Sequence, residues 1–133
     1  IDFTAFPHIL SLTKLLITHG FRVTRLYTDS FPEEEREIFD WLQQHAPHLT
    51  IYPTVHASMR IQPRKSEGKV LAIGQKAAYF SGTDYFVNVV EGAGLWGYEA
   101  IIKLAGLMCE ACETPKDTKS LIQIKGMGCG NCL

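Results

Sequence analysis

Apolar residues recur along this chain at two spacings that alternate from one segment to the next. Residues 2–20 carry Ile9, Leu12, Leu15 and Leu16 at helical spacing and end on a glycine, which predicts a helix. Helices are likewise predicted over residues 30–47, 75–82 and 97–112. Between them, compact apolar runs predict strands over residues 21–27, 49–55, 69–74 and 85–90.

The same spacing predicts which side chains face the core. For the later elements we expect the buried positions to be Phe21, Val23, Tyr27, Ile38, Trp41, Leu42, Ile101, Leu104, Ala105 and Met108. Ser30 and Glu33 form an S-x-x-E capping box at the start of the second helix. The acidic run that follows is then interpreted as a solvated first turn that complements the helix dipole.

Helices that alternate with apolar strands favour a parallel sheet with helices on both faces. The predicted fold class is therefore α/β, a three-layer Rossmann-like domain with an open, mostly parallel sheet. The chain opens on a helix, so the first strand is expected to be missing or reduced to residues 1–3, as in a piece of a longer protein. We assign residues 1–108 to this domain and residues 109–133 to a cysteine-containing extension.

Composition limits the classes of partner. The chain has 133 residues and a net charge of −1, enough for one core and without a global attraction for nucleic acid or an anionic membrane. A basic cluster formed by Arg60, Arg64, Lys65 and Lys69 is interpreted as a solvated loop. With no membrane-spanning run and no signal-peptide pattern, we expect a cytoplasmic protein.

Two strand ends carry the candidate ligand-binding residues. Gly74 closes the apolar run 69–74, and Lys76 lies at the start of the next helix, where backbone N–H groups favour an anion. A plain tight turn with a solvated lysine is the alternative. After the run 85–90, Glu91, Gly94 and Trp96 lie in a glycine-rich passage that lets the backbone approach a cofactor or substrate closely.

All four cysteines lie near the C-terminus as two C-x-x-C pairs separated by sixteen residues, a spacing typical of four-thiolate zinc sites and compatible with an iron–sulfur cluster. The residues are Cys109, Cys112, Cys129 and Cys132. Free thiols, a shared metal centre and redox use all remain open. Helical phase places Cys112 in the apolar stripe, so we expect it to be buried against Met108 and Leu104, with no shared metal.

Several stretches resemble nitrogenase component 1-type proteins, the family of nitrogenase molybdenum–iron subunits, their cofactor-assembly paralogues and dark-operative protochlorophyllide reductase subunits. The resemblance covers roughly residues 2–108. It rests on "LITHGFRVTRLYTD" with "FDWLQQHAPHLTIY", on the glycine turn and lysine of "LAIGQKAAYFSG", and on the glycine–aromatic helix start of "GLWGYEAIIKLA".

The resemblance implies one Rossmann-like domain, C-terminal in an oxidoreductase subunit, that pairs with a paralogous subunit and receives electrons from an ATP-dependent iron protein. An iron–sulfur cluster or metallocluster would belong to the parent complex. Val89, Val90 and Glu91 stand where the molybdenum-nitrogenase subunit has a cofactor-binding histidine, which argues against a cofactor of that type. From a different class, the alternative is a non-catalytic α/β binding module whose cysteine tail holds zinc or an iron–sulfur cluster.

Overall fold

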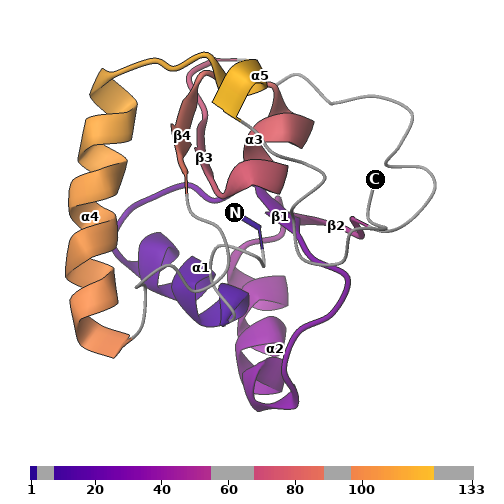
Figure 1. The fold of residues 1–133 in the computed structure, drawn as a ribbon. Helices are drawn as coiled ribbons and strands as arrows, with labels where there is room; N and C mark the ends of the chain where they lie inside the picture. The colour runs from indigo at the N-terminus through magenta and orange to yellow at the C-terminus, as the bar shows by residue number, and fades with distance from the viewer. Residues whose placement is uncertain (3–7, 55–67, 89–96, 122–133) are drawn as a thin grey trace.

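The computed structural model describes residues 1–2, 8–54, 68–88 and 97–121, and within them helices alternate with short strands (Figure 1). A 3₁₀ helix, Glu33–Glu35, directly precedes the second α-helix. The elements are α1 (Ile9–Thr18), β1 (Arg25–Tyr27), α2 (Arg36–His45), β2 (Thr50–Tyr52), β3 (Leu71–Ile73), α3 (Gln75–Ser81), β4 (Tyr85–Val87), α4 (Gly97–Glu113) and α5 (Thr118–Leu121). This order confirms the predicted mixture of helices and strands. The boundary expected at residue 108 falls within α4.

The strands form two small parallel sheets. Strand β1 pairs with β2, and Leu26 lies opposite Ile51. Strand β3 pairs with β4, and Ala72 lies opposite Phe86. Parallel pairing is typical of βαβ units, because the intervening helix carries the chain back to the end of the sheet at which the first strand began.

Residues Ile1 and Asp2 lie between the two sheets and hydrogen-bond to both. The Tyr27 N–H donates to the Ile1 carbonyl at 2.9 Å, and the Asp2 N–H donates to the Ile73 carbonyl at 3.0 Å. Asp2 also forms an isolated parallel bridge with Tyr27. The hydrogen-bonded order is therefore β2, β1, residues 1–2, β3 and β4, and Figure 1 shows the N-terminus at the centre of the molecule.

Successive strand residues belong to two separate apolar clusters. Leu26, Ile73 and Val87 join a cluster with buried side chains of α1, α2 and α4. Their neighbours Tyr27, Ala72 and Phe86 join a second cluster, with α3. Because side chains alternate along a strand, the two clusters lie on opposite faces, and Figure 1 shows α3 and α4 on opposite sides of β3 and β4.

The start of α2 differs from its prediction. Ser30 and Glu33 form no capping box, since α2 begins at Arg36 and no side chain caps it or the preceding 3₁₀ helix. Glu35 is buried instead of solvated, and its carboxylate caps α1: it accepts hydrogen bonds from the Leu10 N–H at 3.2 Å and the Ser11 N–H at 2.8 Å. Unpaired N–H groups of one helix start are thus satisfied by an acid from another element.

The predicted core is confirmed for most positions and wrong for three. Phe21 is 52% exposed, and Ile101 and Ala105 lie on the exposed side of α4. The buried face of α4 is formed by Ala100, Leu104, Met108 and Ala111. The centre of this face is rotated from the predicted stripe, because Ala100 and Ala111 are buried where Ile101 and Ala105 were expected to be.

Candidate functional site

The Gly74 turn joins β3 directly to α3 at the carboxyl end of the strand. Gly74 still belongs to the sheet through its N–H, which donates to the Val87 carbonyl at 3.0 Å, while its own carbonyl accepts the first helical hydrogen bond from the Ala78 N–H at 3.1 Å. Its φ of 103° is a conformation that residues with a Cβ rarely adopt. A single residue therefore makes the change from strand to helix.

The carboxylate of Asp2 lies directly against this turn. Its Oδ2 accepts a hydrogen bond from the Ala77 N–H at 2.9 Å, and Asp2 is fully buried. A Cβ added at Gly74 would overlap the same oxygen. We expected the start of this helix to favour an anion from a ligand, but the chain supplies the anion itself. Position 74 requires glycine because the backbone there lies so close to the Asp2 carboxylate that no side chain fits.

Lys76 lies two residues after Gly74 and is enclosed, with none of its surface exposed. The alternative of a solvated lysine in a plain turn is therefore wrong. Lys76 lies in the first turn of α3, beside the carboxyl end of β3. Its role toward a ligand stays a prediction.

Two amide side chains meet at the ends of β3 and β4. The Gln75 Nε2 donates to the Asn88 Oδ1 at 2.8 Å; Gln75 is buried and Asn88 is exposed. Sequence reasoning missed both residues. Each residue comes within two positions after a buried strand, and this position in the sequence is the signal that could have identified them. The carboxyl ends of parallel strands lie at the same end of the sheet, so residues that follow different strands come together there.

The neighbouring strands β1 and β2 add further polar groups to this edge. The Thr54 Oγ1, after β2, donates to the Asp29 Oδ2, after β1. At the ends of β1 and β2, the Tyr27 ring stacks on the Tyr52 ring, and it also stacks on the Phe80 ring of α3, with centroid separations of 5.4 and 5.5 Å. These residues were not predicted as site residues either. Amide, hydroxyl and carboxylate groups therefore follow the strands at their carboxyl ends.

The remaining predicted pocket residues, Glu91, Gly94 and Trp96, lie outside the described residues, as do Cys129 and Cys132. The chain reaches Glu91 three residues after Asn88, and α4 begins at Gly97. The structure thus brings Gly74 and Lys76 together at one turn, and the other three stay predictions.

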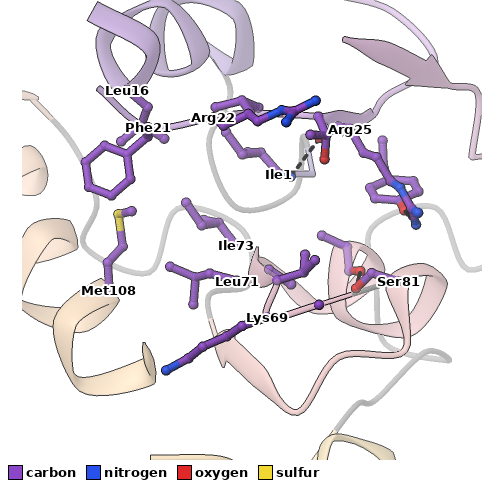
Figure 2. A pocket seen from close by; sticks show the side chains of 17 residues that line it. Ile1, Leu16, Phe21, Arg22, Arg25, Lys69, Leu71, Ile73, Ser81 and Met108 are labelled. Carbon is purple, nitrogen blue, oxygen red and sulfur yellow. Dashed lines mark hydrogen bonds between the residues drawn. The ribbon is translucent and has the colours of Figure 1, made fainter. Parts of the chain in front are cut away.

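A cavity of about 660 Å³ lies between β1 and β3, and its lining includes the residues that precede these strands, the strands themselves, and Ala77 and Ser81 of α3 (Figure 2). Arg22, Arg25 and Lys69 contribute its charged lining. At its centre the Ile1 amino group donates to the Arg25 carbonyl at 3.1 Å, and burial lowers the pKa of that amino group to about 6, with Asp2 opposing and Arg25 reinforcing the shift. The cavity also reaches Ile73 and Ala77, the two residues that hydrogen-bond to Asp2 beside the Gly74 turn.

The first cysteine pair lies in the last turn of α4, and both thiols are free. Cys109 is exposed and Cys112 is partly exposed, whereas Ala111 is completely buried. The expectation that Cys112 is buried against Met108 and Leu104 is therefore wrong. Within the described part of the chain, no group of three or more histidine, cysteine or acidic residues is placed to hold a metal ion.

In the described segments no helix combines the length and the apolar character that crossing a membrane requires. Comparison with protein-family models, with curated proteins and with solved structures yields no match to this chain.

Proposed function

We propose that this chain is a Rossmann-like domain of a nitrogenase component 1-like oxidoreductase subunit, in which the Gly74 edge forms one wall of a cofactor or substrate pocket. The observation that carries the proposal is the hydrogen-bonded order β2, β1, residues 1–2, β3, β4. With residues 1–2 counted as the first strand, this is the order 3-2-1-4-5 of doubly wound folds.

In such sheets the connection after the first strand leads toward one side of the sheet, and the connection after the fourth strand leads toward the other side. Ligands bind outside the carboxyl ends of the strands, at the point where these two connections diverge. Asp2 and Gly74 occupy it here, since Asp2 hydrogen-bonds to the last residue of β3. Gln75, Lys76 and Asn88 flank the same point. The glycine-rich passage with Glu91, Gly94 and Trp96 follows Asn88 in the sequence and completes the proposed wall.

In this proposal the polar groups at the carboxyl ends of the strands bind and orient a ligand, and the redox group belongs to another part of the complex. The proposed partners are a paralogous subunit and an ATP-dependent iron-protein-like donor, in the cytoplasm. It follows that the isolated chain reduces no substrate, with or without the donor.

The proposal is tested in the complex that the chain forms in its native cells. Asn88→Ala removes the exposed acceptor of the Gln75 amide at the proposed wall, whereas Asp84→Ala changes an equally exposed side chain at the amino end of the same strand. We expect Asn88→Ala to lower ATP-dependent substrate reduction several-fold while the control keeps the wild-type rate. Equal rates for the two variants, or substrate reduction by the purified chain alone, contradict the proposal.

A further inference from the structure

Residues 1–2 occupy the position between β1 and β3, and they reach the last residue of each strand. Asp2 bridges to Tyr27, and the Asp2 N–H donates to the Ile73 carbonyl at 3.0 Å. Neighbouring strands of a sheet lie about 4.8 Å apart, so two strands that pair with the same chain stand about 9.6 Å from each other. A single extended chain fills such a space.

The cavity between β1 and β3 extends from Ile1 to the residues that precede both strands (Figure 2). Its volume is about 660 Å³, and its lining includes residues 22–25 on the β1 side and residues 68–73 on the β3 side. Four residues of extended chain span about 13 Å. The cavity is therefore bounded on both sides by the backbone segments that lead into β1 and β3.

On the β3 side, backbone polar groups are directed toward the cavity. The Gly74 N–H donates to the Val87 carbonyl, so the backbone of Gly74 turns toward β4. Because these directions alternate along a strand, the Ile73 N–H and the Leu71 carbonyl are directed to the opposite side, where the cavity lies. The Ile73 carbonyl already pairs on this side, with Asp2.

The β1 side shows the same alternation. The Thr24 carbonyl accepts the Thr50 N–H of β2 at 3.0 Å, and the Arg25 carbonyl accepts the Ile1 nitrogen at 3.1 Å on the opposite side. The Tyr27 N–H donates to the Ile1 carbonyl at 2.9 Å, which completes a parallel pairing of Ile1 with β1. A residue placed before Ile1 would continue this ladder toward the amino end of β1.

The surroundings of the Ile1 nitrogen favour an uncharged group. Burial lowers the pKa of this amino group to about 6, with Asp2 opposing and Arg25 reinforcing the shift. A peptide N–H can donate the same hydrogen bond to the Arg25 carbonyl, and it avoids the cost of removing an ammonium group from water. A chain that continues through Ile1 therefore fits this position better than a charged group does.

We propose that the cavity is a slot for an extended segment joined to the amino end of Ile1, which pairs with β1 and β3 as a parallel strand. The segment would donate to the Leu71 carbonyl and accept from the Ile73 N–H on one side, and it would pair with the backbone ahead of Tyr27 on the other. This strand slot does not depend on the ligand pocket proposed at the carboxyl ends of the strands.

Alternation also defines the side chains that the strand slot accepts. Ile1 belongs to the apolar cluster with α1, α2 and α4, whereas the Asp2 carboxylate contacts Ala77 of α3. The residue directly before Ile1 therefore faces α3, where Ala77 lines the cavity. The residue before that one faces Leu16 and Met108, which line the cavity on the other side of the sheet. We expect a small or β-branched residue at the first position and a large apolar residue at the second.

An anionic ligand is the competing occupant, because Arg22, Arg25 and Lys69 contribute to the lining. Two of these cationic side chains contact tyrosines. The Arg25 Nη1 donates to the Tyr27 hydroxyl at 3.5 Å, and the Lys69 Nζ lies 4.6 Å from the centroid of the Tyr85 ring. Backbone groups directed inward from both strands are the more specific feature, and they favour a strand over an anion.

The test adds four residues before Ile1 of the 133-residue chain. One version carries Lys-Thr-Ile-Val, which places the added valine toward α3 and the added isoleucine toward Leu16. The matched control carries Gly-Ser-Gly-Ser, which has the same length and the same amide at Ile1 but forms a flexible coil. We expect the first version to unfold at a temperature about 5 °C or more above the control. Its Ile73 N–H should exchange with solvent at least about tenfold more slowly.

A third version, Lys-Thr-Ile-Pro, tests the hydrogen bonds of the slot. Proline has no N–H to donate to the Leu71 carbonyl, so we expect this version to lose most of the gain in unfolding temperature. Four results overturn the proposal: equal unfolding temperatures for the Lys-Thr-Ile-Val version and the Gly-Ser-Gly-Ser control, loss of folding in the Lys-Thr-Ile-Val version alone, a proline version as stable as the valine version, or decanoate, an apolar anion, that binds the Lys-Thr-Ile-Val version as tightly as the 133-residue chain.

Discussion

At the scale of single residues, the candidate site depends on one contact between distant parts of the sequence. The buried Asp2 carboxylate accepts the Ala77 N–H and occupies the space in which a Gly74 side chain would begin. Buried carboxylates are costly unless hydrogen-bonded, so neither partner changes without disturbing the other. The contact thus explains why position 74 is a glycine and why position 2 is an aspartate.

This contact predicts that Gly74→Ala is much more damaging than alanine at another glycine with positive φ. Gly20 has a φ of 91° but nothing within 4 Å of an added Cβ, whereas at Gly74 the Asp2 carboxylate must move. Backbone strain alone costs about 1–2 kcal/mol. We expect a loss of about that size for Gly20→Ala and about 2–4 kcal/mol for Gly74→Ala, measured by urea unfolding. Equal losses would mean that Asp2 does not lie against the turn.

A second prediction concerns Glu35, which caps α1 from a distant element. Its carboxylate accepts three hydrogen bonds, from the Leu10 N–H, the Ser11 N–H and the Ser11 hydroxyl. Glu35→Ala should lower the unfolding free energy by about 1–3 kcal/mol, because buried donors lose their acceptor. The neighbouring Glu33→Ala removes only an exposed pair with Arg36 and should cost less than about 0.5 kcal/mol. Similar losses from both variants would contradict the cap.

At the scale of elements, the sequence predicted type and order well because each segment carries its own periodicity. Helix α4 shows the limit of that reasoning. The apolar stripe suggested Ile101 and Ala105 as core positions, yet Ala100 and Ala111 are the residues with no exposed surface. Alanines permit close approach of the helix to β4, and a spacing argument that weights residues by hydrophobicity misses them.

The candidate site was predictable only where its signal is local. Gly74 and Lys76 follow an apolar run and were found. The Asp2–Ala77 hydrogen bond joins residues 75 positions apart, and the Gln75–Asn88 pair depends on the register of β3 against β4. Neither can be read from one segment alone, because each follows from how strands pair in space.

Helix α4 carries the third prediction. Leu104 is 2% exposed on the buried face, while Ile102 is 65% exposed on the other. Leu104→Ala should cost about 2–5 kcal/mol of unfolding free energy through the lost contacts and the cavity left behind. Ile102→Ala should change it by less than about 0.5 kcal/mol. Thermal or urea unfolding of the two variants checks this, and reversed values would place the other face of α4 against the sheet.

At the scale of the whole molecule, two residues at the start of the chain connect the halves. Without the hydrogen bonds of Ile1 and Asp2, β1–β2 and β3–β4 would be separate two-stranded sheets, which are marginal on their own. With these bonds, the carboxyl ends of all strands meet at one edge, and the polar groups after β1, β2, β3 and β4 lie together. The proposed pocket depends on this arrangement.

The most direct test of this arrangement is the measurement of scalar couplings across hydrogen bonds in solution by nuclear magnetic resonance. We expect couplings between the Tyr27 nitrogen and the Ile1 carbonyl carbon, and between the Asp2 nitrogen and the Ile73 carbonyl carbon. The Gly74–Val87 hydrogen bond, within one sheet, serves as the internal reference. A visible reference coupling with no Asp2–Ile73 coupling would contradict a single connected sheet, and with it the site proposed at its edge.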